Sequence, residues 1–216
     1  MDRYFVEKLI PSDPGLEAAR RASATADLPP IDVTPNQGKL LYLLARMQGA
    51  RRILEIGTLG GYSTIWLARA LLSDGKLVSL EVEAKHAEIA RDNIQRAGLS
   101  SLVEIRLGPA LASLAQLHEE QAPPFDFIFI DADKPSNPQY LDLSLQLSRP
   151  GTIIVVDNVV RDGAVIDSES ADPSIQGTRK FFDKLAAVPR LEATALQTVG
   201  SKGYDGFAIA RVKSFP

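Results

Sequence analysis

Short apolar runs alternate along this chain with longer segments in which apolar residues recur at helical spacing. The run at 53–56 is typical: three glycines follow it, and a helical pattern begins just after them. The other runs expected to be strands are 76–82, 103–108, 125–131 and 151–158. Helical patterns lie between them at 84–98 and 140–147, and again at 178–188. Strands that alternate with helices predict an α/β fold with a mostly parallel sheet.

The two ends of the chain follow other patterns. Residues 193–199 and 206–212 read as strands, and the link between them is too short for a helical crossover, which predicts an antiparallel hairpin. The first forty residues are rich in proline and predict a helical lid followed by an extended entry segment. We expect residues 1–216 to form one domain, because 216 residues is an ordinary size for a single core.

Composition narrows the classes of function. A net charge of −3 offers no broad basic field, so we expect no nucleic-acid partner. The chain has no cysteine, which excludes disulfides and thiolate chemistry and leaves oxygen and nitrogen ligands. No stretch approaches the roughly 18 apolar residues of a membrane span, and the start lacks the apolar core of a signal peptide. We therefore expect a cytoplasmic protein with no membrane partner.

The segment ILEIGTLGGYS (53–63) has the layout of a nucleotide-type cofactor site: a strand end, a tight glycine loop and a helix start. Glu81 lies 24 residues after Gly57, at the next strand end, close to the spacing at which an acid meets a ribose in dinucleotide-binding folds. The glycine pattern is G-x-x-G-G and not G-x-G-x-x-G, which weakens the case for NAD. Glu55, just before the first glycine, suits a ligand with an ammonium group, such as S-adenosylmethionine (SAM).

Acidic residues gather where the predicted strands end, the edge at which ligands bind in such sheets. They are Glu55, Glu81, Asp131, Asp133 and Asp157, the last followed by Asn158. Each alone could be a helix cap or turn former, but like charges crowded together need a cation or a ligand to offset them. Asp131, Asp157 and Asn158 are hard oxygen donors that suit Mg²⁺ first, with Mn²⁺ or Ca²⁺ as alternatives.

One lysine and two histidines complete the candidates. His86 and His118 both fall in helical segments, and we expect them to be solvated rather than to bind a ligand. Lys134 could be an ordinary surface lysine. Beside a metal and a cationic cofactor its ammonium form would be disfavoured, and it would then serve as a general base.

These residues belong to a longer ordered series, LEIGTLGGYSTIWLARAL, SLEVEAKHAEIARDNIQRAGL, GPAL, FDFIFIDADK and VVDNVVRDGAV. Together the motifs resemble the cation-dependent class I O-methyltransferases, which include the catechol and caffeoyl-coenzyme A enzymes, over roughly residues 31–212. The resemblance implies a Rossmann-like, doubly wound, seven-stranded and mostly parallel sheet with an antiparallel C-terminal hairpin. It also implies a homodimer.

The resemblance assigns a role to each candidate. It implies that SAM is bound by Val33, Glu55, Gly57, Thr58, Ser63, Glu81, Ala110 and Asp131. Asp131, Asp157 and Asn158 align with the metal ligands, and Lys134 aligns with the catalytic lysine. Asp133 and Asp162 fall at substrate positions, although Asp162 replaces an asparagine of the plant enzymes. That replacement leaves the acceptor open.

The function expected from the sequence is O-methylation of a catechol-like small molecule by SAM, assisted by a divalent cation. Two alternatives remain at this point. An NAD-dependent oxidoreductase would share the fold class but lacks the G-x-G-x-x-G loop. A non-catalytic SAM-binding protein would have no evident use for Lys134 or the three metal-ligand candidates.

Overall fold

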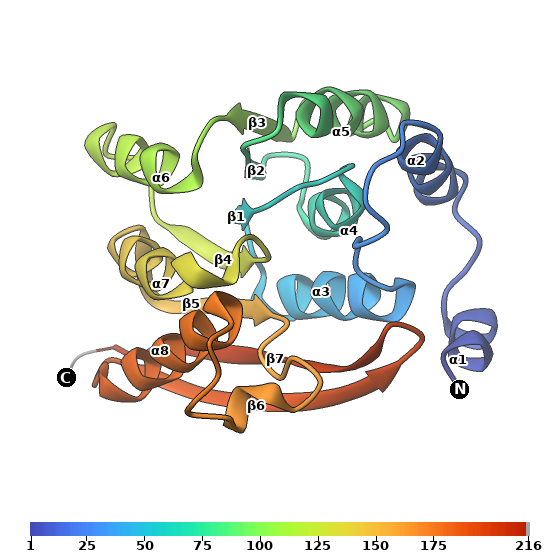
Figure 1. The fold of residues 1–216 in the computed structure, drawn as a ribbon. Helices are drawn as coiled ribbons and strands as arrows, with labels where there is room; N and C mark the ends of the chain where they lie inside the picture. Colours follow the sequence, from blue (N-terminus) through green and yellow to red (C-terminus); the bar gives the residue numbers. More distant parts are fainter. Residues whose placement is uncertain (215–216) are drawn as a thin grey trace. The chain divides into compact units, whose positions relative to one another are not determined.

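The computed structural model describes residues 1–214 and contains two compact units, Met1–Ala110 and a second that begins at Leu111 (Figure 1). Each unit contributes a set of hydrogen-bonded strands. Among the described residues the strands number seven, and the last two form an antiparallel hairpin. The predicted α/β fold class is therefore confirmed.

The first unit contains three parallel strands in the order β3-β2-β1. Its elements are α1 (Asp2–Leu9), α2 (Pro14–Thr25), α3 (Pro35–Gln48), β1 (Arg52–Ile56), α4 (Tyr62–Ala70), β2 (Lys76–Glu81), α5 (Ala84–Arg96) and β3 (Val103–Leu107). Proline at the first position and a side-chain cap start both α2 and α3, where Asp13 accepts from Leu16 N and Thr34 from Gln37 N. The first forty residues contain helices as predicted, and their role as a lid stays a prediction.

Helix α3 packs closely on α4 at a single glycine. A Cβ atom added to Gly38 would lie 2.3 Å from Cδ1 of Trp66, so only glycine admits the indole at this position. Tyr42 meets the same ring edge to face with 6.3 Å between centroids, and Lys39 Nζ lies 4.4 Å from the centroid of Tyr42.

The second unit holds four strands in the order β4-β5-β7-β6. Its elements are α6 (Ala110–Glu119, which begins at the last residue of the first unit), β4 (Phe125–Ile130), a 3₁₀ turn η1 (Lys134–Ser136), α7 (Asn137–Gln146), β5 (Ser148–Asp157), η2 (Ala164–Ile166), α8 (Pro173–Ala187), β6 (Leu191–Gly200) and β7 (Gly203–Val212). β4 and β5 run parallel, whereas β7 is antiparallel to both β5 and β6.

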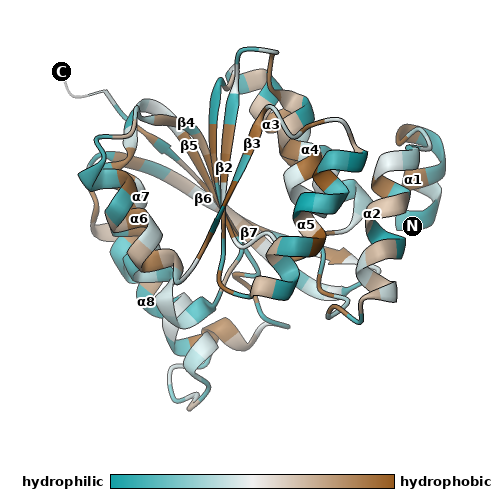
Figure 2. Ribbon diagram, turned by 90° about the horizontal axis from the view of Figure 1, so that it is seen from above, coloured by the Kyte–Doolittle hydropathy of each residue, from teal (hydrophilic) through white to brown (hydrophobic). Residues whose placement is uncertain are grey.

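The centre of the second unit is strongly apolar. Every residue of β4 is buried, including Phe125, Phe127 and Phe129. Figure 2 shows brown, hydrophobic stretches within β4 and β5. A continuous buried run of this kind marks a strand covered on both faces. The one carboxylate in β4, Asp126, accepts a hydrogen bond from Arg149 Nε at 2.9 Å, which offsets the cost of burying its charge.

Some element boundaries differ from those expected. α7 begins at Asn137, three residues before the predicted start, and α8 begins at Pro173, five residues before. Asp172 is the N-cap of α8, and its carboxylate accepts from Ser174 N at 2.7 Å. Pro173 follows as the first helical residue, a position that proline favours. β6 and β7 are longer than predicted because pairing continues to Gly200 and Gly203, leaving a two-residue turn. No helix in residues 1–214 is long and apolar enough to cross a membrane.

Candidate functional site

The glycine loop that joins β1 to α4 needs left-handed backbone conformations. Gly57 has φ 98° and Gly61 has φ 81°, values that glycine adopts at no steric cost. Leu59 between them has φ 49°, which is uncommon for a residue with a side chain. Gly61 also lies against α5, since a Cβ there would be 3.3 Å from Cα of Ala90. The loop is thus fixed in shape before α4 begins at Tyr62.

Glu55 lies at the centre of a buried hydroxyl network behind this loop. Its side chain is fully buried, and its carboxylate accepts hydrogen bonds from Ser63 Oγ at 2.6 Å, Thr64 Oγ1 at 2.5 Å and Ser79 Oγ at 2.6 Å. Thr58 Oγ1 joins the network through Thr64 Oγ1 at 2.6 Å. The network ties β1, β2 and the start of α4 together. A direct contact of Glu55 with the cofactor stays a prediction.

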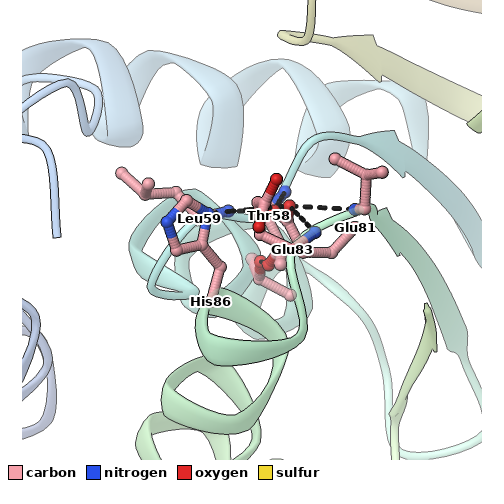
Figure 3. A network of polar contacts seen from close by, with 7 residues as sticks. Thr58, Leu59, Glu81, Glu83 and His86 are labelled. Carbon is pink, nitrogen blue, oxygen red and sulfur yellow. Dashed lines mark hydrogen bonds and ion pairs between the residues drawn. The ribbon is translucent and has the colours of Figure 1, made fainter. Parts of the chain in front are cut away.

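Glu81 closes β2, and its carboxylate binds backbone amides of the glycine loop, as Figure 3 shows. Its Oε2 accepts from the backbone N–H of Thr58 at 3.3 Å and of Leu59 at 2.9 Å. Its Oε1 accepts from the N–H of Val82 at 2.9 Å and of Glu83 at 3.0 Å. Four amide donors satisfy a carboxylate that is only 7% exposed. The residue predicted to bind a ribose therefore holds the glycine loop, and its contact with a ribose stays a prediction.

His86 belongs to this cluster, and the expectation that it is a solvated residue was wrong. It lies in the first turn of α5 with its side chain 21% exposed, and its Nδ1 is 3.6 Å from Oε1 of Glu81 (Figure 3). His86 falls five residues after Glu81, so the short turn between β2 and α5 brings the imidazole back onto the strand end.

The remaining cofactor candidates of the first unit are placed as follows. Val33 is 4% exposed in the extended segment before α3, and Ala110 is the first residue of α6. Thr58 and Ser63 are both buried in the loop and at the start of α4. The structure brings Glu55, Thr58, Ser63 and Glu81 into two linked networks, while the contacts of Val33 and Ala110 with a cofactor stay predictions.

In the second unit the strand register brings two acids side by side. Ile130 of β4 pairs with Val156 of β5, so Asp131 and Asp157 are the next residues of adjacent parallel strands. Parallel neighbours lie about 4.8 Å apart, close enough for one cation to meet both carboxylates. Asn158 follows in a left-handed conformation with φ 56°, which asparagine tolerates better than most residues.

The donors in this group fit a hard divalent cation. Asp157 is 5% exposed and its Oδ1 accepts from Asn158 N at 2.8 Å, which fixes the direction of the carboxylate. Two carboxylates and one amide oxygen match the preference of Mg²⁺ for oxygen donors completed by water or substrate. Among residues 1–214, no three His, Cys, Asp or Glu side chains gather as a metal site, and the expected trio contains only two such residues. The metal assignment therefore stays a proposal.

Lys134 is not a surface lysine. It is 7% exposed, and its Nζ donates to Oδ1 of Asp131 at 3.0 Å. Its backbone is held by α8, because a Cβ at Gly177 would lie 2.4 Å from the Lys134 carbonyl oxygen. The structure thus fixes this side chain beside one of the two acids.

Asp133 and Asp162, the expected substrate residues, differ in their surroundings. Asp133 caps η1 by accepting from Ser136 N at 3.2 Å, and it also accepts a hydrogen bond from the hydroxyl of Tyr140. Burial raises the pKa of Tyr140, and the Asp133 carboxylate raises it further, so this phenol remains a donor. Asp162 is exposed in the loop after β5, with φ 54°. Neither placement tests a contact with substrate.

Three residues that hold parts of the candidate site by hydrogen bonds were not singled out in the sequence. Ser79 is the lone hydroxyl in the buried run of β2, and the register places it opposite Glu55. Thr64 lies in the first turn of α4, where its hydroxyl reaches the same carboxylate. Asp205 sits in β7 and holds the loop after β5. A polar residue inside a buried run was the available signal for Ser79; no local signal marks Asp205.

A family model described as O-methyltransferase matches residues 9–212. Among curated proteins, the chain is 54% identical to a catechol O-methyltransferase of Niastella koreensis, an alignment that covers 99% of this chain and 96% of that one. This similarity favours methyl transfer over an oxidoreductase and over a non-catalytic binding protein.

Two solved structures are very similar to this one. An O-methyltransferase from Bacillus cereus in complex with SAH has a TM-score of 0.97 and 61% identity, covering 98% of this chain and 96% of the other. The O-methyltransferase TomG from Streptomyces achromogenes, involved in tomaymycin synthesis and solved in complex with SAM, has a TM-score of 0.95 and 50% identity, covering 99% and 96%.

Proposed function

Because the chain belongs to the O-methyltransferase family, we propose that it transfers the methyl group of SAM to one hydroxyl of a vicinal dihydroxy aromatic compound, with the help of a divalent cation. The observation that carries this proposal is the pair Asp131 and Asp157 at adjacent strand ends, with the buried Lys134 hydrogen-bonded to the first. Two neighbouring hydroxyls of one ring could complete the coordination of a cation held by these oxygens.

The first unit would bind the cofactor. Glu55 supports the glycine loop through hydroxyl hydrogen bonds at the start of α4, and Glu81 binds a loop amide from the end of β2. The loop backbone is therefore organised before a ligand arrives. Such preorganisation lowers the entropy lost on binding. We infer that Glu81 accepts from the ribose hydroxyls and that Val33, Gly57, Thr58, Ser63 and Ala110 line the remainder of the cofactor site in this unit.

The second unit would carry the chemistry. Asp131, Asp157 and Asn158 would hold the cation, with Mg²⁺ preferred over Mn²⁺ or Ca²⁺. Bound SAM supplies a methyl group already activated on its sulfonium, and a bound cation makes an acceptor hydroxyl more acidic. The Nζ atom of Lys134, once neutral, would take the proton of that hydroxyl, and burial of this side chain keeps the amine at a fixed place. Asp133 and Asp162 would contact the acceptor.

We further propose that the protein works as a homodimer in the cytoplasm, with a small phenolic substrate and without nucleic acid or membrane. α1 has no buried residue in the single chain and leaves Tyr4 and Leu9 exposed, which supports a partner surface there. Light scattering at micromolar concentration should give twice the chain mass of 23.4 kDa. A mass of one chain would remove the dimer from the account.

The proposed activity is tested by incubating the protein with SAM, Mg²⁺ and a panel of phenols, and by identifying products by mass spectrometry. We expect mono-methyl ethers of vicinal diphenols and little product from phenols with one hydroxyl. Calorimetry with SAM and with NAD separates the alternatives, since only SAM should bind. SAM binding without any methylated product would instead favour a non-catalytic SAM-binding protein.

A further inference from the structure

The loop that follows β5 has an unusual backbone. Residues Asn158, Arg161 and Asp162 have φ values of 56°, 56° and 54°, and Gly163 has 86°. Left-handed conformations are uncommon for residues with side chains, and each costs free energy unless the surroundings hold it in place. This loop carries one proposed metal ligand, Asn158, and one proposed substrate contact, Asp162. Contacts with the rest of the second unit must therefore hold this loop in its conformation.

The backbone amides of four successive loop residues are bound by β7. Val159 N donates to Gly206 O at 3.1 Å, and Asp162 N donates to Tyr204 O at 3.0 Å. Between these two bonds the backbone of β7 supplies no acceptor for the amides of residues 160 and 161; the side chain of Asp205 supplies it instead. Val160 N and Arg161 N both donate to Oδ1 of Asp205, each at 3.0 Å.

The same oxygen accepts a third hydrogen bond, from Gly206 N at 2.9 Å. Three donors on one carboxylate oxygen fix its position, and hydrogen bonds to a charged acceptor are stronger than neutral ones. Gly206, the residue after Asp205, allows the loop to lie close to β7. A Cβ at Gly206 would lie 2.7 Å from Cγ2 of Val160 and 2.2 Å from the carbonyl oxygen of Leu196, so only glycine fits between loop and strand.

From this geometry we propose that Asp205 is a positioning residue: it holds the 158–163 loop and thereby sets Asn158 toward the cation and Asp162 toward the acceptor. The inference rests on the proposed function for those two roles. Asp205 itself touches neither cation nor substrate in this account. It acts through the two amides that it binds, which lie two and three residues after Asn158.

The test compares Asp205→Ala, which leaves two loop amides without their acceptor, with Asp205→Asn, which keeps one side-chain oxygen to accept them. Asp183→Ala is the matched control, because Asp183 is an exposed carboxylate on α8 of the same unit. Removal of such supporting residues at metal sites typically costs about 10–100-fold in affinity or activity. Three quantities are measured for each variant: Mn²⁺ affinity by electron paramagnetic resonance, KM for a vicinal diphenol, and SAM affinity by calorimetry.

For Asp205→Ala we expect Mn²⁺ binding to weaken and acceptor KM to rise, each roughly 10-fold or more, while SAM affinity stays within about twofold of wild type. Asp205→Asn should recover most of both losses, and Asp183→Ala should match wild type. Mn²⁺ affinity and KM unchanged in Asp205→Ala would overturn the proposal. So would equal losses in Asp205→Asn and Asp205→Ala, because an accepting oxygen would then not be what matters.

Hydrogen exchange separates failure of this inference from failure of the proposed function. Amides of residues 160–161 should lose protection in Asp205→Ala and keep it in Asp205→Asn. If wild type neither binds Mn²⁺ nor methylates a diphenol, the proposed function fails, and the positioning role toward a cation fails with it. If wild type does both but exchange is unchanged in Asp205→Ala, only the positioning role fails. Asp205→Glu, which displaces the carboxylate by one methylene, replaces Asp205→Ala should that variant not fold.

Discussion

The amine of Lys134 lies 3.0 Å from Oδ1 of Asp131, the first residue after β4. The two residues are three apart in sequence, and the turn into η1 directs the lysine back to the strand end. A general base must take up a proton, and the amine of Lys134 lies beside the negative charge of the Asp131 carboxylate. A cation shared by Asp131 and Asp157 would offset the carboxylate charge. The proposed base and the proposed metal site therefore depend on each other.

Replacement of Lys134 by alanine should slow the chemical step and leave cofactor binding nearly intact. We expect kcat to fall by roughly 10²–10⁴ near neutral pH, the usual contribution of a positioned acid or base. The deficit should shrink as pH rises, because the acceptor hydroxyl then ionises without help. Rates are measured across pH together with SAM affinity, with Lys180→Ala on the exposed side of α8 as control. A loss that is constant with pH would assign Lys134 an electrostatic role only.

Glu81→Ala should weaken SAM binding by about 1.5–3 kcal/mol, the typical value of hydrogen bonds to a charged group. The physical reason is twofold: the ribose would lose its acceptor, and the amides of Thr58 and Leu59 would lose theirs. Calorimetry measures the dissociation constant. Glu83→Ala, at an exposed acid two residues away, is the control and should bind SAM as wild type does. An unchanged constant in Glu81→Ala would place the ribose elsewhere.

Asp157→Ala should abolish turnover while SAM still binds. Asp157 is a proposed metal ligand in the second unit, and its carboxylate is already oriented by the amide of Asn158. Turnover with Mg²⁺ and calorimetry with SAM give the two readouts, and Asp167→Ala, an exposed acid after η2, serves as control. Cofactor affinity that collapsed in Asp157→Ala alone would show that the role assigned to this residue is wrong.

Gly177→Ala tests how Lys134 is held. Inside an exposed helix this change would add about 1 kcal/mol of stability. Here the new Cβ would lie 2.4 Å from the Lys134 carbonyl oxygen and 2.5 Å from Cα of Pro135, so η1 must shift. We expect a loss of about 1–3 kcal/mol in the free energy of unfolding, as for other overpacked sites, with a lowered kcat. Denaturant unfolding and steady-state rates measure both, and a stabilised, fully active variant would contradict the packing argument.

The sequence predicted the strands and most helices because strong apolar periodicity marks them. β4 is an unbroken buried run, and α5 begins at Ala84 as predicted and ends at Arg96, two residues before the predicted end. The starts of α7 and α8 were missed because polar residues and prolines open them, and capping by Asp172 became visible only in the structure. The two strand-end acids, Asp131 and Asp157, were expected to lie together because parallel strands share a carboxyl edge, and the register places them so.

Contacts that depend on side-chain direction were harder to predict. His86 carries no sequence signal that it turns back to Glu81, and helical position alone suggested solvent. The surface alternative for Lys134 was excluded only by its burial and its bond to Asp131. Asp205 lies 47 residues after Asn158, and only the return of β7 beside β5 brings the two regions together. These contacts depend on packing between segments that are distant in the sequence, and the local sequence pattern does not predict such packing.

The central claim is cation-assisted methylation of one of two neighbouring hydroxyls, and one comparison tests it most directly. Initial rates of methyl transfer from SAM are measured for a vicinal diphenol and for the same ring with a single hydroxyl. Each is measured after rigorous chelation and again after Mg²⁺ is restored. The account predicts product from the diphenol with Mg²⁺, near-complete loss on chelation, recovery on restoration, and little product from the single hydroxyl at any stage. Equal rates for the two rings, or a diphenol rate undiminished by chelation, would contradict it.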